Sequence, residues 1–247
     1  MGKIERLRTA GELLARGHPW VRSEVPADTT GIRAWATDGA YAFLSSRADG
    51  GPGWLNALGE PSAAIALVRH ALAELPVKPR GFTVPRSAHI LLPADLPVRD
   101  IDHWNFRWTS TPPPPMPGEE RVVELKDADE EIRELLSVAS PRHSAPPGDP
   151  TVRRWVGIRD EHDRLVACGA ETRRPGGLAH LASIATLPGM RGRGLGAAVT
   201  AWLTRRVLDE GDDVCTLGQY ADNEVARRLY SRLGYTDDDH FTSGRFG

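Results

Sequence analysis

The residues best able to do chemistry gather in one short stretch, "RGRGLG", which begins at residue 191. Glycines at alternate positions let a backbone turn tightly and approach a ligand closely, because no Cβ intervenes. An apolar run precedes the stretch and an apolar-periodic segment follows it, so it should join a strand to a helix. The first N–H groups of such a helix, its dipole and two arginines favour a pyrophosphate. The expected contacts are Arg191, Gly192, Arg193, Gly194, Leu195, Gly196 and Ala197.

Other interpretations of this stretch stay open at this point. Gly192, Gly194 and Ala197 also fit the dinucleotide-fold spacing G-x-G-x-x-A, with Asp212 and Asp213 about twenty residues further on. In that fold the acidic residue ends a strand, whereas these two precede the apolar run "VCTL". A P-loop needs Gly-Lys-Ser/Thr, and the stretch has no lysine. A glycine-rich turn with solvated arginines is the purely structural alternative.

The surrounding sequence predicts alternating strands and helices that would hold the stretch in place. Helices are expected over 127–139, from the glycines to about residue 210, and over 223–233. Five strands and a final strand pair are expected in "RVVEL", "RWVGIRD", "RLVACGAETR", "LAHLASIATL", "DVCTLGQY" and "YTDDDHFTSGRF". The second and third of these strands should form a hairpin, which an all-parallel dinucleotide fold lacks.

A second motif downstream decides between the interpretations. "NEVARRLYSRLGY", residues 223–235, resembles the Asn-x-x-Ala-x-x-Leu-Tyr-x-x-x-Gly-Phe/Tyr segment of the GCN5-related N-acetyltransferase (GNAT) family. Arg191, Gly194 and Gly196 match the acetyl-CoA signature of that family, Arg/Gln-x-x-Gly-x-Gly/Ala. The resemblance covers residues 121–247. It implies the GNAT fold, a mixed α/β fold whose central mixed, mostly antiparallel sheet is flanked by helices.

The resemblance also implies an activity, in which acetyl-CoA donates an acetyl group to a primary amine by direct attack in a ternary complex, with no metal. Ile184, Ala185 and Thr186 would offer a strand edge to pantetheine, and a bulge there would leave an oxyanion donor. Tyr230 matches the frequent general acid of the family. Its alternative role is to pack and to hydrogen-bond the sulfur. Asn223 should cap its helix and lie near the pantetheine or phosphate.

The general base is the least determined residue of the site. Some family members carry a glutamate on the strand before the glycines, and "HLASIATL" has none. Glu171 and His180 are the candidates, acting directly or through water, and Ser183 could polarise such a water. A water chain or a substrate that is already deprotonated would serve instead. The missing glutamate also leaves open a non-catalytic acyl-CoA-binding sensor or regulatory module.

Four consecutive prolines within residues 111–120 predict an extended linker between a lobe over 1–110 and the acetyltransferase-like domain over 121–247. In the first lobe we expect a hairpin at Asp38-Gly39, a loop over "GGPGWLNALGEP", and a helix capped by Ser62. This order echoes the second half of the acetyltransferase fold without its glycine signature. The lobe is therefore a degenerate copy or an unrelated cap, and it should help to shape the acceptor site.

Composition narrows the partners and the setting. The 247 residues carry a net charge of −2, so no overall field favours nucleic acid or an anionic membrane. No apolar run approaches the ~20 residues of a membrane span, and the opening residues lack a signal-peptide core. Two cysteines in apolar strands predict buried thiols, so we expect a cytoplasmic protein. The acceptor would be a small-molecule or peptide amine, and a homodimer is left open.

Overall fold

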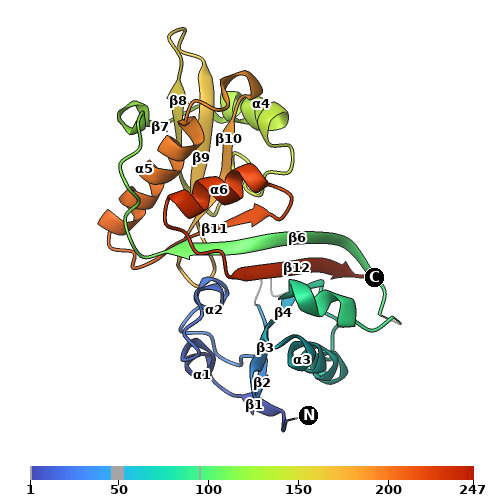
Figure 1. Ribbon diagram of the computed structural model, residues 1–247. Helices are drawn as coiled ribbons and strands as arrows, with labels where there is room; N and C mark the ends of the chain where they lie inside the picture. The colour runs from blue at the N-terminus through green and yellow to red at the C-terminus, as the bar shows by residue number, and fades with distance from the viewer. Residues whose placement is uncertain (1, 46–52, 95) are drawn as a thin grey trace. The chain divides into compact units, whose positions relative to one another are not determined.

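The computed structural model describes residues 2–45, 53–94 and 96–247, which form two compact units (Figure 1). The first unit comprises Met1–Phe106, Gln219–Asn223 and Asp237–Gly247, and the second comprises Arg107–Gly218 and Glu224–Thr236. This division differs from the one expected at the proline-rich stretch. A strand at the C-terminal end of the chain belongs to the first unit, because it pairs with strands from the first half of the chain.

Seven strands in the order β1-β2-β3-β4-β5-β12-β6 form the sheet of the first unit. Neighbours are antiparallel except β4 and β5, which are parallel and joined by the crossover helix α3. The elements are β1 (Glu5–Leu7), α1 (Ala10–Leu14), α2 (Pro19–Glu24), β2 (Ala34–Thr37), β3 (Ala40–Leu44), β4 (Trp54–Gly59), α3 (Pro61–Glu74), β5 (Gly81–Pro85), the 3-10 helix η1 (Arg86–Leu91), β6 (Val98–Thr109) and β12 (Asp239–Phe246).

Local sequence predicted part of this unit and missed part of it. The hairpin of β2 and β3 is confirmed, and Gly39 supplies the left-handed turn with φ of 79°. The "WLNALG" segment was expected to be a loop or short turn, and this was wrong, because it forms β4. Residues 55–58 are all buried, so the strand lacks the alternation that marks an exposed strand. Residues 46–52 of the expected loop lie outside the described residues.

The second unit has the element order that the sequence predicts, with strands in the order β11-β10-β9-β8-β7. Only β10 and β11 are parallel, so the mixed, mostly antiparallel sheet is confirmed. The expected strand pair at the C-terminal end is instead one strand, β12. The elements are η2 (Glu119–Arg121), β7 (Val123–Leu125), α4 (Asp129–Ala139), β8 (Val152–Arg159), β9 (Leu165–Arg173), β10 (Ala179–Thr186), η3 (Pro188–Met190), α5 (Leu195–Asp209), β11 (Cys215–Tyr220) and α6 (Glu224–Arg232).

Two apolar clusters cover the two faces of β9 and β10 in this unit. Residues of helices α5 and α6 pack with Leu181 and Leu217 on one face of the sheet (Figure 1). Helix α4 packs with Cys168 and Ala185 on the other face. A Cβ added at Gly169 would lie 2.9 Å from Val199 Cγ1, so this glycine allows α5 to approach β9 closely. No helix of the described residues is long and apolar enough to span a bilayer.

Candidate functional site

The site begins where β10 loses its partner on one side. Strand β11 pairs with β10 only at Ala179, His180 and Leu181. On its other side β10 stays paired with β9 as far as Thr186. Residues 182–186 of β10 therefore present an edge that β11 does not cover. The backbone groups of such an edge can pair with an extended, amide-rich ligand.

A bulge lies at the start of this open edge. The register with β9 shifts between Ala182 and Ala185, where β10 carries one residue more than its partner. Ser183 takes up the bulge with φ of 54°, a left-handed conformation that is uncommon for a residue with a side chain. Of the three residues predicted to contact pantetheine, Ile184 packs toward α5 and Ala185 toward α4. These two residues and Thr186 belong to the segment of β10 that β11 does not cover, and their contact with pantetheine stays a prediction.

Beyond the edge the chain turns through glycines into α5. Gly192 and Gly194 are left-handed, with φ of 77° and 80°, and open space lies where a Cβ would stand at either residue. Gly194 caps α5, and no side chain caps this helix within the described residues. The first turn, Leu195 to Ala197, therefore keeps its N–H groups free for an anion. This arrangement is what the alternating glycines predict.

The two arginines of the loop have different surroundings. Arg191 donates from Nε to the carbonyl of Thr186, at 3.3 Å, and from Nη2 to the carbonyl of Ala139, at 3.0 Å. Its guanidinium thus fastens the end of α4 to the end of β10. Arg193 is exposed and makes no hydrogen bond or ion pair with the described residues. Of the two, Arg193 is the one whose charge is available to a phosphate.

Helix α6 lies over the join between β10 and α5. A Cβ added at Gly196 would lie 3.5 Å from Thr186 Oγ1 and 3.7 Å from Leu229 Cδ1. The open strand edge, the first turn of α5 and one face of α6 thus meet at Gly196. Tyr230 follows Leu229 on α6 and packs in the same apolar cluster as Leu195. The two sequence motifs are therefore neighbours in space.

Tyr230 has a buried ring and a hydroxyl that makes no hydrogen bond with the described residues. The oxygen of that hydroxyl keeps some solvent-exposed surface. Burial raises the pKa of Tyr230 to about 12, and the charge of Arg107 opposes this shift. Arg107 is itself fully buried and donates to Ser231 Oγ and to the carbonyl of Thr236. Nothing in the sequence indicates that Arg107, which lies between aromatic residues in "HWNFRW", would be buried near Tyr230.

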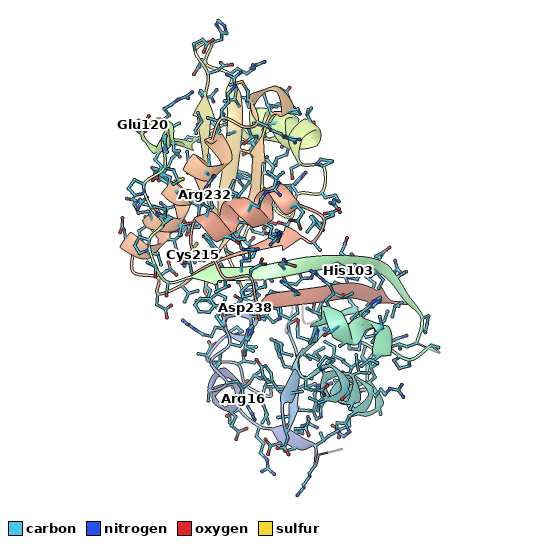
Figure 2. All side chains as sticks on the ribbon, viewed as in Figure 1. Arg16, His103, Glu120, Cys215, Arg232 and Asp238 are labelled. Carbon is cyan, nitrogen blue, oxygen red and sulfur yellow. The ribbon has the colours of Figure 1, made fainter. Side chains whose placement is uncertain are left out.

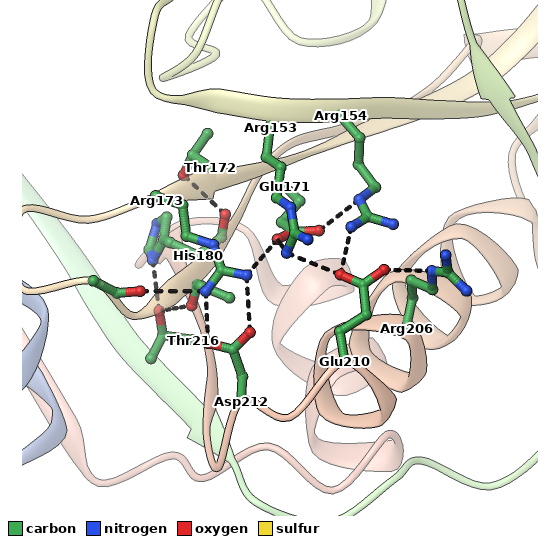
Figure 3. A network of polar contacts seen from close by, with 12 residues as sticks. Arg153, Arg154, Glu171, Thr172, Arg173, His180, Arg206, Glu210, Asp212 and Thr216 are labelled. Carbon is green, nitrogen blue, oxygen red and sulfur yellow. Dashed lines mark hydrogen bonds and ion pairs between the residues drawn. The ribbon is translucent and has the colours of Figure 1, made fainter.

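Glu171 is enclosed by arginines rather than poised as a base (Figure 3). Its carboxylate is fully buried and lies 2.8 Å from Arg154 Nε, 3.0 Å from Arg173 Nη2 and 3.3 Å from Arg153 Nη1. Glu210, the C-cap of α5, joins the network at the end of this helix opposite the glycine loop. A carboxylate without exposed surface, contacted by three guanidinium groups, has no room to contact an attacking amine. These contacts weigh against the base role predicted for Glu171.

Replacing this carboxylate should damage stability more than turnover. Glu171→Gln leaves three arginine partners without their shared charge, and breaking a buried ion network costs about 3 kcal/mol or more of unfolding free energy. Denaturant unfolding measures that loss, with the exposed Glu134→Gln on α4 as a control that should change little. A Glu171→Gln protein that stays folded should keep its kcat. A folded variant without activity would restore the base role.

His180 lies on the same face as α4, opposite Thr172 of β9 (Figure 3). Thr216 Oγ1 donates to the carbonyl of Ala179, at 2.8 Å, so it can only accept from His180 Nδ1, 3.0 Å away. The proton of the neutral ring is therefore on Nδ1. Burial and the charge of Arg174 lower the pKa of His180 to about 3. A ring of that basicity can accept a hydrogen bond, but it is a poor proton acceptor for an amine.

The depressed pKa of His180 has a consequence for stability. The unfolded chain binds this proton near the ordinary histidine pKa of about 6.5, whereas the folded chain binds it only near pH 3. The free energy of unfolding therefore falls as the pH falls between those two values. His180→Gln should lose less stability than the wild type between pH 7 and pH 4.5, which denaturant titration at both values measures. Equal losses would contradict the buried neutral ring.

Asn223 directly precedes α6 and belongs to the first unit. Its amide donates to the carbonyl of Tyr220, at 3.0 Å, and its own carbonyl accepts from Gln219 Nε2, at 3.4 Å. Its predicted roles as a helix cap and as a CoA contact remain predictions. The two cysteines are confirmed as free and buried, Cys215 being labelled on β11 in Figure 2. Burial raises the pKa of each thiol to about 12.

The first unit repeats the parallel crossover but not its anion site. Strands β4 and β5 also pair at three residues only, and α3 connects them. This helix begins with the carboxylate of Glu60, which accepts from the amides of Ser62 and Ala63, and with Pro61, which has no N–H. The hydrogen bonds of Ser62 and the two amides lower the pKa of Glu60. The cap is thus Glu60 rather than the expected Ser62, and a negative charge already occupies the place that a pyrophosphate needs.

Comparisons with known proteins agree with this geometry. Residues 155–242 match the family model "FR47-like protein", which is related to the GNAT acetyltransferases. A putative GNAT acetyltransferase from Novosphingobium aromaticivorans is 23% identical, with a TM-score of 0.55 over 97% of this chain and 96% of that one. A GCN5-related N-acetyltransferase from Kribbella flavida is 19% identical, with a TM-score of 0.52 over 96% and 95%. One from Sphaerobacter thermophilus is 15% identical, with a TM-score of 0.55 over 96% and 89%.

The chain therefore has the GNAT fold, and the resemblance drawn from the two motifs is confirmed at that level. Both units are included in the likeness, since the matching structures cover nearly the whole chain. No curated protein sequence matches the chain significantly. No group of three or more metal-ligating side chains is found among the described residues.

Proposed function

We propose that this protein is an acetyl-CoA-dependent N-acetyltransferase, which moves the acetyl group to a primary amine by direct attack in a ternary complex. The observation that carries the proposal is the continuity of three binding elements. The open edge of β10 leads to the uncapped first turn of α5, and Tyr230 lies in the apolar cluster beside that turn. A ligand that matches these elements has an amide-rich arm for the strand edge, a pyrophosphate for the helix turn and a thioester near Tyr230.

Each part of the donor has a place in this arrangement. The pyrophosphate would accept from the amides of residues 192–197 and pair with the exposed guanidinium of Arg193. Pantetheine would pair with the backbone of Ile184, Ala185 and Thr186. The acetyl group would then reach the bulge at Ser183, where a backbone N–H could stabilise the developing oxyanion. Because the Glu60 carboxylate already caps α3 in the first unit, we expect one donor site in each chain, in the second unit.

The surroundings of the cysteines support direct transfer. A ping-pong route through an acyl-cysteine needs an accessible thiolate, and both cysteines are buried thiols whose pKa is about 12. In direct transfer the amine nitrogen attacks the thioester carbon, the C–S bond breaks, and CoA leaves as a thiolate. The nitrogen loses one proton and the sulfur gains one, so the site needs a proton acceptor and a proton donor.

Tyr230 is the proposed partner of the departing sulfur. A phenol with a pKa of about 12 stays protonated, so it can always donate a hydrogen bond. Transfer of its proton to an ordinary thiolate, whose pKa is about 8.5, is uphill by about 3.5 pKa units. Burial raises the pKa of a thiol, as Cys168 and Cys215 show in this unit, and so narrows that gap. Tyr230 therefore stabilises the thiolate by a hydrogen bond and gives up its proton as the sulfur becomes desolvated.

The acceptor and the setting follow from the same chemistry. An uncharged primary amine on a small molecule or a peptide would be the nucleophile, and a cytoplasmic protein would have acetyl-CoA at hand. The test is thiol release from acetyl-CoA with a panel of aliphatic amines, arylamines, amino acids and peptide N-termini. Amine-dependent release is expected for at least one class. Tight acetyl-CoA binding without release across the panel would indicate the sensor or regulatory module instead.

A further inference from the structure

The segment that follows α4 is fastened to β10 at two points. At its start, the carbonyl of Ala139 accepts from Arg191 Nη2, and Arg191 Nε donates to the carbonyl of Thr186. At its end, Ser183 Oγ donates to the carbonyl of Ala145, at 2.7 Å, and accepts from the amide of Ala145, at 3.1 Å. Residues 139–145 are therefore held beside the bulged part of β10, which is paired with β9 at one edge and open at the other.

The sequence interpretation gave Ser183 a different task, the polarisation of a catalytic water. Its hydroxyl has one proton, and that proton is used by the carbonyl of Ala145. Ala145 is buried against it. Ser183 is therefore a positioning residue that joins the bulge to the loop.

His143 lies within this fastened segment, two residues before Ala145. Its Nδ1 lies 2.9 Å from the carbonyl of Ser140, which can only accept, so Nδ1 carries the proton of the neutral ring. Nε2 then holds the lone pair. Nε2 makes no hydrogen bond or ion pair with the described residues. It also keeps solvent-exposed surface, so it is accessible. The loop thus presents a partly exposed imidazole with a free basic nitrogen.

The faces of the sheet separate the two proton-transfer tasks. Tyr230 belongs to the cluster on the α5 face of the sheet, where the sulfur would leave. The loop follows α4, which packs with Ala185 on the other face. Because β10 and β11 separate beyond Leu181, a thioester at the bulge could be reached from both faces. An amine that attacks from the α4 face would meet the fastened loop.

We propose that His143 Nε2 is the general base that takes the proton from the attacking amine. This inference rests on the proposed function and names the group that the sequence left open. In the step, the amine nitrogen forms its bond to the thioester carbon and transfers one proton to Nε2, and the C–S electron pair leaves with sulfur. The base candidates that the sequence offered are less suitable, since Glu171 is held by three arginines and the pKa of His180 is lowered to about 3.

The test compares His143→Ala and His143→Gln with the wild type, in the full-length protein, on the best acceptor from the amine panel. Removal of a general base should lower kcat by about 100-fold. The Kd for acetyl-CoA and the midpoint of thermal unfolding should stay unchanged, because the side chain bonds only within its own loop. Added imidazole should restore part of the rate of His143→Ala, which a merely structural role would not allow. His162→Ala, in the exposed turn between β8 and β9, is the matched control and should keep full activity.

Two results would overturn the assignment. A His143→Ala protein with wild-type kcat would show that the base is elsewhere. A loss that imidazole does not restore, with a lowered unfolding midpoint in both variants, would assign His143 to the structure of the loop. These failures differ from a failure of the proposed function, in which the wild type itself transfers no acetyl group to any amine.

Discussion

Replacement of Gly194 by glutamate is expected to weaken acetyl-CoA binding by about 100-fold, or about 2.7 kcal/mol. Gly194 caps α5 in a left-handed conformation, and open space lies where its side chain would be. A carboxylate there should accept from the first amides of α5, as Glu60 does at the start of α3. It would occupy the pyrophosphate site with the wrong charge. Calorimetric titration with acetyl-CoA measures the change.

The control for this variant is Gly211→Glu. Gly211 is also left-handed, with φ of 100° and open space around its missing side chain, but it follows the C-terminal end of α5. Both variants carry the backbone strain and the new charge, so they should lose similar stability. Only the change at residue 194 should affect the donor. Equal affinity of Gly194→Glu and wild type would remove the donor site from this loop.

The second large effect is expected from Tyr230→Phe, which should lower kcat by about 10- to 1000-fold. The change removes the hydroxyl that would stabilise the departing sulfur and leaves the ring that packs beside α5. Since the hydroxyl makes no hydrogen bond with the described residues, stability should stay close to that of the wild type. Binding of acetyl-CoA should also be kept, because the pyrophosphate loop is untouched. Initial rates at saturating donor and acceptor give kcat.

Tyr235→Phe is the matched control for this change. The hydroxyl of Tyr235 lies 2.7 Å from Thr204 Oγ1 and 3.3 Å from Cys215 Sγ, deep in the same cluster. Its loss should cost about 1 kcal/mol of unfolding free energy and leave kcat unchanged. We thus expect Tyr230→Phe to change kcat and not stability, and Tyr235→Phe to change stability and not kcat. A Tyr230→Phe enzyme with wild-type kcat, when chemistry limits turnover, would exclude the role of its hydroxyl.

The sequence predicted the strand, glycine turn and helix of the candidate donor site, because these features depend on local geometry. Alternating glycines, a strand before them and a helix after them are properties of about twenty consecutive residues, and the left-handed Gly192 and Gly194 follow from them. The segment of α6 added a second local pattern. Together they were sufficient for the GNAT fold of the second unit, and the order of its elements is as expected.

The parts that the sequence did not predict depend on residues far apart in the chain. Strand β12 joins the first unit because it pairs with β5 and β6, and no local pattern shows this pairing. The two hydrogen bonds between Ser183 Oγ and the backbone of Ala145 join residues that are 38 positions apart. Arg191 reads as a phosphate ligand in the signature, whereas its guanidinium donates to two backbone carbonyls. Contacts of this kind decide which residues are available to a substrate.

The central claim is that this chain transfers an acetyl group from acetyl-CoA to an amine without an acyl-enzyme intermediate. The most direct measurement mixes the protein with acetyl-labelled acetyl-CoA and the best amine of the panel, and follows the label through a single turnover. The account predicts that labelled amide and free CoA appear at the same rate and that the protein stays unlabelled. Label on the protein before the amide forms, or label released only as acetate, would contradict it.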